Sequence, residues 1–226
     1  MKLTGFFTRA LTVVGLLTLG TVSTQAGTLN LSTGLDASNT LITLGNTLDA
    51  HWTVDQFSGG TAPAKVVDAT NADSGFPYWS PNGPNSSWIT IDPNTTHNDP
   101  FALVAYSYYR TFNLTASEVA TAAISGVWGI DDGGNLKLNG NTLSSVPNDY
   151  SATTSFSAAA GSGLFVAGVN TLKITMTSSD NFLEAVRLEG TLTGVSSVPE
   201  PSTLLLAICG LPLVLVARRR RLRSAA

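Results

Sequence analysis

Short runs of β-forming residues, separated at close intervals by turn-forming residues, fill the middle of this 226-residue chain. Two of the runs, 172–177 and 186–192, alternate apolar and polar residues, as strands of a half-exposed sheet do. The turns between runs are rich in Gly, Asn, Asp and Pro, which favour tight turns. The expected strands are residues 41–44, 65–67, 88–91, 101–109, 124–130, 136–138, 165–166, 171–177 and 185–192.

Many short strands without alternating helices predict an antiparallel β-sandwich. Only residues 116–123 suggest a helical turn. Residues 27–197 are long enough for one hydrophobic core, and they contain no cysteine, because the single cysteine of the chain is Cys209. The stability of this body must therefore come from burial and not from disulfides. We predict one all-β domain over residues 27–197.

The first 26 residues have the parts of a secretory signal peptide. Lys2 and Arg9 precede an apolar stretch at 10–19, and small residues then lead to Ala26. This order predicts cleavage after Ala26. The apolar stretch is too short to span a bilayer as an ordinary helix. We therefore expect residues 27–197 to be exported.

The C-terminus joins an apolar run to a basic end. Residues 204–217 would rise about 21 Å as a helix, or about 26 Å with residues 201–203, close to a hydrocarbon core of roughly 30 Å. Cytoplasmic flanks of membrane helices collect basic residues, and this run is followed by Arg218, Arg219, Arg220, Arg221 and Arg223. We predict a transmembrane helix at about 202–217 with the basic tail inside. The alternative is a buried C-terminal helix, which needs protein cover on all sides.

Pro199, Glu200 and Pro201, the apolar run and the arginine cluster together resemble the PEP-CTERM sorting signal of Gram-negative bacteria. In that family an exosortase, a membrane cysteine peptidase, cuts near the Pro-Glu-Pro and passes the protein outward, typically in species that make exopolysaccharide. The resemblance covers residues 198–226. It implies export across the inner membrane, transient anchoring in that membrane, and delivery to the cell surface or extracellular matrix. It implies nothing about the activity of the exported body.

The charge of the chain is distributed unevenly. The net charge is −3, but seven of the twelve basic residues lie in the two end segments and fourteen of the fifteen acids lie in the body. The body therefore carries five basic residues and a charge of −9. Such a body repels phosphate backbones, so we expect no nucleic-acid partner, whereas divalent cations are compatible with it.

Four segments of the body occur in an order that resembles the galactose-binding-like jelly roll. This fold is similar to the non-catalytic sugar-binding domain at the front of some glycoside hydrolases. The resemblance runs from about residue 79 to 190 and implies a jelly-roll architecture more than an activity. The segments are an aromatic-Arg-x-Phe strand at 109–112, an acidic turn at 131–132, a Leu-Asn-Gly hairpin at 138–140 and a Gly-x-Asn-Thr-Leu strand at 168–172.

Aromatic residues between positions 76 and 110 are the candidate ligand-binding groups, because flat rings beside Asn and Asp suit the apolar faces and hydroxyl rims of sugars. Tyr106 and Tyr108 share one parity on their strand and Tyr109 has the other, so only one set can face outward. The competing interpretation is that these rings fill the core. The candidates are Tyr78, Trp79, Trp88 and Tyr108.

Asp131, Asp132 and Asn135 are candidate calcium ligands, because crowded oxygen ligands beside glycine suit a hard cation. Their loop lacks the third-position acid and the distal Glu of an EF-hand. A solvated hairpin turn is the alternative, since Asp and Asn favour turns without an ion. No other cofactor is indicated.

Catalytic signatures are missing from the sequence. It contains no Gly-x-Ser-x-Gly elbow and no His-Glu-x-x-His, and His51 and His97 have no readable partners. We therefore expect a non-catalytic protein. The two resemblances together imply an exported protein whose body binds or packs against exopolysaccharide. A purely structural matrix protein without a ligand pocket is the alternative, and a carbohydrate-active enzyme is a third interpretation.

Overall fold

The computed structural model describes residues 26–56, 59–68, 78–91, 105–147, 149–177 and 184–196. These residues contain eleven strands and no helix, and every strand pairing among them is antiparallel. The strands are β1 (Ala26–Asn30), β2 (Leu48–Asp55), β3 (Thr61–Val66), β4 (Ile89–Thr90), β5 (Ala105–Leu114), β6 (Ala123–Asp131), β7 (Gly133–Leu138), β8 (Asn141–Val146), β9 (Asp149–Ala158), β10 (Gly168–Thr177) and β11 (Ala185–Ser196).

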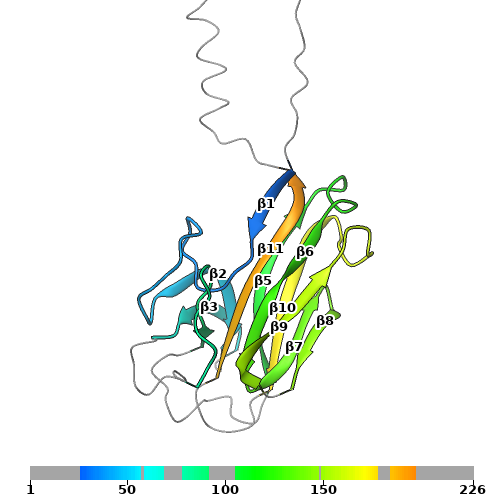
Figure 1. Cartoon of the computed structure of the whole chain (residues 1–226). Helices are drawn as coiled ribbons and strands as arrows, with labels where there is room; N and C mark the ends of the chain where they lie inside the picture. Colours follow the sequence, from blue (N-terminus) through cyan, green and yellow to red (C-terminus); the bar gives the residue numbers. More distant parts are fainter. Residues whose placement is uncertain are drawn as a thin grey trace, which may run out of the picture.

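One hydrogen-bonded path runs β8-β7-β10-β5-β2-β3-β4-β11-β6-β9, and β1 pairs with β11 beside this path. The path folds over on itself, because its two end strands, β8 and β9, touch each other. Trp128 of β6 also donates a hydrogen bond from Nε1 to the hydroxyl of Ser144 in β8, at 3.0 Å. The prediction of an all-β antiparallel sandwich is thus confirmed. Figure 1 shows β11 and β6 over β5 and β10.

The core lies between these layers and draws on nearly every strand. Along β10, residues 170, 172, 174 and 176 are buried and their neighbours are not, as the alternation of the sequence predicts. The largest fully buried side chains are Trp52, Trp88, Trp128 and Tyr108. Burial of such large rings is the main stabilising term that a body without cysteine has.

The turn between β7 and β8 confirms the hairpin prediction. Leu138 pairs with Asn141, so the loop has two residues, and Asn139 and Gly140 have φ angles of 49° and 86°. Both angles lie in the left-handed region that this hairpin turn needs, and Asn and Gly are the residues that adopt it at least cost.

Several boundaries differ from the prediction. Residues 41–44 form no strand beyond an isolated bridge at Leu41, and residues 165–166 form a turn. In that turn Asn170 accepts from the backbone N–H of Val166 at 2.9 Å and donates to its carbonyl at 2.7 Å, so a side chain replaces a strand partner. Residues 115–122 make successive turns and no helix. The strands that the sequence did not predict are β1, β2, β8 and β9.

Arg110 of the aromatic-Arg-x-Phe segment points inward on the same face of β5 as Tyr108 and Phe112, and it is only 8% exposed. Its guanidinium donates to the carbonyls of His51 and Asn30, both at 3.4 Å. Burial and the charge of Arg110 together lower the pKa of His51. Arg110 therefore supplies a buried cation to the scaffold, whereas Tyr109, on the opposite face of β5, is half-buried with Lys173 Nζ 5.3 Å from its ring centroid.

Asp49 fixes the long connection between β1 and β2. Its carboxylate accepts the backbone N–H groups of Gly34 at 2.6 Å, His51 at 2.7 Å and Trp52 at 2.9 Å. Burial raises the pKa of Asp49, and these three hydrogen bonds oppose that rise. The buried carboxylate thus satisfies three N–H groups and ties residues 31–47 to the start of β2.

We predict that Asp49→Ala lowers the free energy of unfolding by at least about 2 kcal/mol, because it leaves buried backbone N–H groups without acceptors. Asp36→Ala is the matched control. Asp36 also accepts two backbone N–H groups, those of Ser38 and Thr40, but in an exposed turn where water can replace it. Urea unfolding of both variants measures the difference, and equal losses would contradict this role of Asp49.

Candidate ligand-binding site

The four aromatic candidates have very different exposures. Trp79, Trp88 and Tyr108 are 4%, 0% and 0% exposed, whereas Tyr78 is 74% exposed. Tyr108 lies in the core with Tyr106, so the inward set on β5 is the one that contains both. Of the four candidates, only Tyr78 presents its ring to solvent.

Trp79 and Trp88 form the base of the segment that carries Tyr78. Their ring centroids are 4.8 Å apart with planes inclined by 33°, and they pack with Val67 and Ala185 in a small second core. Both indole N–H groups find acceptors inside the protein. That of Trp79 donates to Asp131 at 2.6 Å, and that of Trp88 donates to the carbonyl of Ser80 at 2.8 Å. Buried tryptophans with satisfied polar tips position the segment and do not offer their faces to a ligand.

A second exposed ring belongs to the same end of the molecule. Tyr150 is 38% exposed, and its carbonyl accepts the backbone N–H of Ser80 at 2.8 Å. This bond joins the start of β9 to the segment that carries Tyr78. The sequence does not single out Tyr150, because Tyr150 stands in a Ser- and Thr-rich stretch at the start of a strand that the sequence did not predict either. The one signal was an isolated tyrosine beside Asp149.

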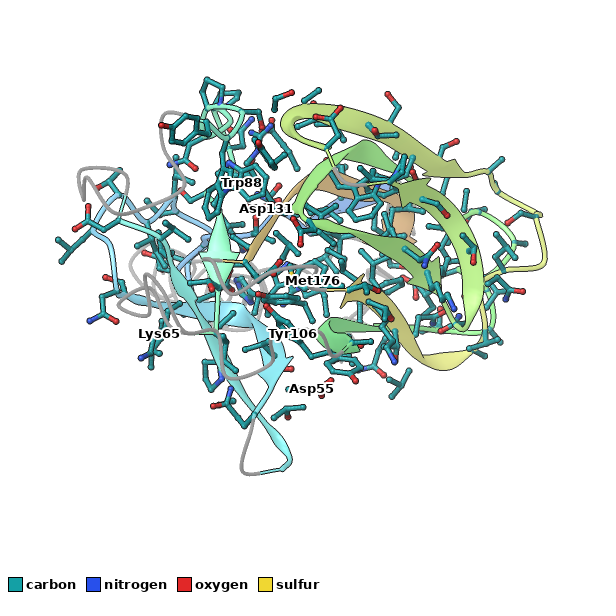
Figure 2. All side chains as sticks on the ribbon, turned by 90° about the horizontal axis from the view of Figure 1, so that it is seen from below. Asp55, Lys65, Trp88, Tyr106, Asp131 and Met176 are labelled. Atoms are coloured by element: carbon teal, nitrogen blue, oxygen red, sulfur yellow. The ribbon has the colours of Figure 1, made fainter. Side chains whose placement is uncertain are left out.

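We call this region the distal end and define it as residues 78–88, 131–133, 149–150 and 184–185. It lies opposite the chain ends, because Ala185 at the start of β11 pairs with Asp131, and Ser196 at the other end of β11 pairs with Ala26. Figure 2 looks at the molecule from this end, with Trp88 and Asp131 next to each other.

The three candidate calcium ligands have partners within the protein. Asp131 accepts from Trp79, the backbone carbonyl of Asp132 accepts from the N–H of Asp149 at 3.1 Å, and Asn135 accepts from the hydroxyl of Ser145 at 2.7 Å. Asp132 is only 6% exposed. Within the described parts of the chain, no three His, Cys, Asp or Glu side chains gather as a metal site. Calcium binding at this loop stays a prediction.

The structure brings together two groups of candidate residues that lie far apart in the sequence. The ring candidates at 78–88 and the acids at 131–132 both lie at the distal end, linked by the bond from Trp79 to Asp131. Polar groups flank the exposed tyrosines, including Asn82, which accepts from the N–H of Trp88 at 3.0 Å. Exposed rings beside amides and carboxylates suit a neutral polyhydroxylated ligand and disfavour a polyanion.

The candidate sorting residues, Pro199, Glu200, Pro201 and Arg218 to Arg221, lie outside the described residues, as does the predicted signal peptide up to residue 25. Among the residues that the structure does describe, no helix is long and apolar enough to cross a bilayer.

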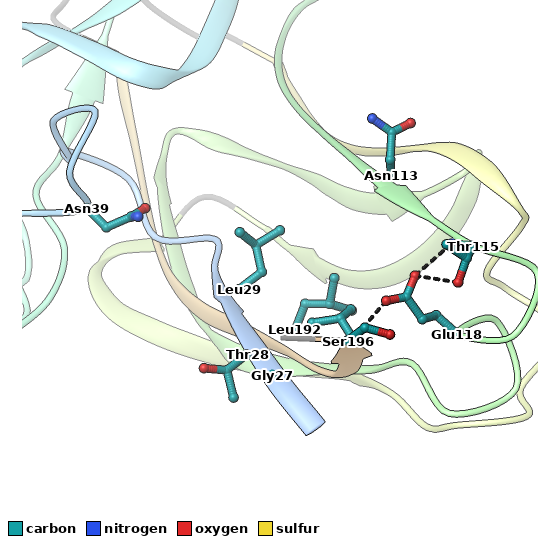
Figure 3. Close-up of a pocket in the computed structure, with 10 residues that line it drawn as sticks. Gly27, Thr28, Leu29, Asn39, Asn113, Thr115, Glu118, Leu192 and Ser196 are labelled. Carbon is teal, nitrogen blue, oxygen red and sulfur yellow. Dashed lines mark hydrogen bonds between the residues drawn. The ribbon is translucent and has the colours of Figure 1, made fainter. Parts of the chain in front are cut away.

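A cavity of about 840 Å³ lies at the opposite end from Tyr78, beside the chain ends (Figure 3). Leu29, Leu192 and Val195 give it apolar walls, and Asn113, Thr115 and Glu118 give it polar ones. No residue that the sequence selected lines this cavity.

Glu118 connects the loop at 115–122 to the last residue of β11. Its carboxylate accepts the backbone N–H of Ser196 and both the N–H and the hydroxyl of Thr115, the latter two at 2.7 Å. Thr121 adds a bond from its hydroxyl to the carbonyl of Gly194 at 2.7 Å. A Cβ at Gly194 would meet the carbonyl oxygen of Thr121 at 2.0 Å, so the close approach needs glycine. We call these contacts the Glu118 clamp.

No protein-family model matches the chain, and no curated protein matches it. Among solved structures, a β-D-mannosidase from Dictyoglomus thermophilum is 17% identical, with a TM-score of 0.36, over 67% of this chain and 16% of the mannosidase. The CBM36-1 domain of a multidomain xylanase from the hindgut metagenome of Trinervitermes trinervoides is 16% identical, with a TM-score of 0.26, over 53% of this chain and 88% of that domain.

A family 35 carbohydrate-binding module from Clostridium thermocellum is 13% identical to the chain, with a TM-score of 0.27, over 50% of this chain and 82% of the module. The chain thus spans less than a fifth of the mannosidase and most of each binding module. All three TM-scores are below 0.5, so these likenesses carry no argument about function.

We predict that Glu118 stabilises the fold most at neutral pH. The three hydrogen bonds that its carboxylate accepts lower the pKa of Glu118 from 4.5 to about 2, and the bond from the N–H of Ser196 has the largest effect. A carboxyl whose pKa is lower in the folded protein contributes stability above its unfolded pKa and loses that contribution as the pH falls toward the folded value. Glu118→Gln should therefore cost most stability above about pH 5, and the cost should shrink as the pH falls toward about 2.

Urea unfolding of the wild type and Glu118→Gln across this range measures the effect. Thr121→Val is the control, because it removes a neighbouring hydrogen bond that does not titrate. Its cost should not vary with pH. A constant cost for Glu118→Gln as well would contradict the lowered pKa.

Proposed function

We propose that this chain is an exported, non-catalytic protein whose distal end binds extracellular polysaccharide. In this proposal a signal peptide directs export across the inner membrane of a Gram-negative bacterium. The C-terminal PEP-CTERM signal anchors the body transiently, and an exosortase then releases it to the cell surface or matrix. Binding and sorting are separate parts of the proposal and are tested separately.

The observation that carries the binding proposal is the exposed pair Tyr78 and Tyr150, on two segments joined by the bond from Ser80 to Tyr150. The backbone that carries each ring is held in place. Tyr78 precedes the buried pair Trp79 and Trp88, and Tyr150 is the second residue of β9, which pairs with β6. A backbone that is already ordered loses little entropy when a ligand binds to the rings that it carries.

The position of the chain ends supports the sorting proposal. Strand β1 begins at Ala26, where the sequence predicts cleavage of the signal peptide, and β11 ends at Ser196, three residues before Pro199. The two strands pair, so the predicted leader and the predicted anchor would leave the body at one end (Figure 1). The tyrosines at the other end would then face away from the membrane.

A structural matrix protein without a ligand is the second candidate. The observation that favours it is the burial of Trp79, Trp88 and Tyr108, since most of the selected rings fill the core. A carbohydrate-active enzyme has less support, because the carboxylates of Asp131 and Asp149 already accept hydrogen bonds from Trp79 and Ser151.

We predict that residues 27–198 are retarded in native gels that contain the exopolysaccharide of the source bacterium. Each of Tyr78→Ala and Tyr150→Ala should weaken binding by up to about tenfold, since a ring contact contributes about 0.5–1.5 kcal/mol. Val169→Ala removes an exposed apolar side chain at the opposite end and is the control. Unretarded migration of the wild type, with a cooperative unfolding transition intact, would favour the structural role.

We predict that replacement of Pro199, Glu200 and Pro201 by alanine leaves the full-length protein in the inner membrane. Without the tripeptide the exosortase cannot cut, whereas the apolar run and its arginines still hold the anchor. Fractionation and immunoblotting of cells that express either form measure this. Normal release of the triple variant would refute exosortase processing while leaving polysaccharide binding intact.

A further inference from the structure

The end of the body where Ala26 and Ser196 lie carries fewer charged side chains than the distal end. We call it the terminal pole and define it as residues 26–30, the loop 115–122, residues 159–169 and residues 191–196. The register joins these pieces, because Ala26 pairs with Ser196, and Ile124 pairs with both Leu192 and Ala158. The terminal pole contains one ionisable side chain, Glu118. The distal end, in contrast, contains the carboxylates of Asp131, Asp132, Asp149 and Glu184.

The single carboxylate of the terminal pole is occupied by the protein itself. Glu118 is only 9% exposed, and its two oxygens accept from Ser196 and Thr115 in the Glu118 clamp. The pole therefore presents no unpartnered negative charge among its described residues. Of the two ends of this body, which carries a charge of −9, the terminal pole is the one that an anionic surface would repel less.

Apolar and small side chains cover the outside of this pole. Val166 is 45% exposed, and Val169 is 62% exposed. Between β9 and Val166 the exposed residues are Ala159, Ala160, Gly161, Ser162 and Gly163. Removal of the two valine side chains from water is favourable, and such small uncharged loops bring no charge that must be desolvated.

The length of chain beyond Ser196 limits where this pole can lie. Residues 197–201 separate Ser196 from the membrane segment predicted at about 202–217, and five residues span at most about 18 Å. The Glu118 clamp fixes Ser196 at the pole. A short tether gives a high effective concentration, on the order of millimolar, so a weak surface contact is enough to hold the pole against the bilayer.

Cleavage after Ala26 would add a favourable charge at the same place. The new amino group of Gly27 would lie in β1, beside the end of β11. An α-amino group has a pKa of about 7.7–8.0 and is largely positive at neutral pH. Anionic headgroups attract such a charge.

We infer that the terminal pole is a lipid-docking surface, which rests on the bilayer while the tail is anchored and directs Tyr78 and Tyr150 outward. This inference rests on the anchoring part of the proposed function. The partner is the headgroup and upper acyl region of the membrane that holds the tail. Exosortase cleavage would then break both the tether and the docking, because the contact is too weak to persist without the tether.

The test uses residues 27–226, the chain without its predicted signal peptide, in vesicles of phosphatidylethanolamine and phosphatidylglycerol. Cys209→Ala removes the native thiol, and a polarity-sensitive fluorophore is attached through Val169→Cys at the terminal pole or Ser151→Cys near the distal end. Both positions are exposed in the body. We expect the label at position 169 to shift to the blue and to be quenched by nitroxide-bearing lipid. The label at position 151 should be quenched by aqueous iodide instead.

Flotation of the vesicles distinguishes failure of the membrane anchoring from failure of the docking. A chain that does not float refutes the anchoring on which the inference rests. A chain that floats with both labels equally open to iodide overturns the docking and leaves the anchoring intact. Val166→Asp, combined with the label at position 169, should restore access to iodide without loss of flotation.

A second copy of the chain is the other occupant that could cover the valines. Protection of the label at position 169 that persists in detergent micelles and rises with protein concentration would identify such a dimer. That result would overturn the lipid assignment. Protection that requires the bilayer and does not depend on protein concentration supports it.

Discussion

Strand β11 is the element on which the rest of the sandwich depends. It pairs with β6 along nine residues, with β1 toward its C-terminal end and with β4 near its start. Its inward residues Val186, Leu188 and Leu192 belong to the main core, and Ala185 belongs to the smaller core under Tyr78. One strand thus joins the two hydrophobic clusters and runs from the distal end to the terminal pole.

The two ends of β11 present different chemistry because different partners meet there. At the start of the strand the tryptophan pair and Asp131 support an exposed tyrosine. At its end Glu118 and Thr121 hold the backbone of the strand, and only uncharged side chains surround them. Under the proposed function, a membrane tether at one end and exposed rings at the other suit a molecule that is held on one side and makes contact on the other. A packed core lies between the distal end and the terminal pole, so the distance between these two ends is fixed.

The sequence was informative where backbone rules or alternation dominate and less so where tertiary contacts decide. Asn139-Gly140 specified its hairpin, because few residue pairs accept two left-handed conformations. The Ser- and Thr-rich strands β8 and β9 were missed, since their outward residues carry no apolar pattern. Residues 165–166 looked like a strand, but the side chain of Asn170 took the backbone partners of Val166.

The same limit applies to the candidate site. Their spacing in the sequence indicates that Tyr106 and Tyr108 face the same side of their strand, but only the packing shows that this side faces the core. The sequence left Trp79 open between a surface ring and a core ring, and the acceptor of its N–H, Asp131, lies 52 positions away in sequence. Tyr150 became a candidate only through its backbone bond to Ser80. Contacts between distant segments define this end, and one sequence does not reveal them.

The pairing of β1 with β11 also has a consequence for how such a body reaches its folded state. A chain that crosses a membrane from its N-terminus delivers β1 first and β11 last, so the first strand waits for nearly the whole domain before it gains its partner. Contacts of such high sequence separation slow folding, because the loop must close before the pairing stabilises anything. If the chain is exported as we propose, the sandwich would therefore remain unfolded during translocation and close only when its final strand has emerged.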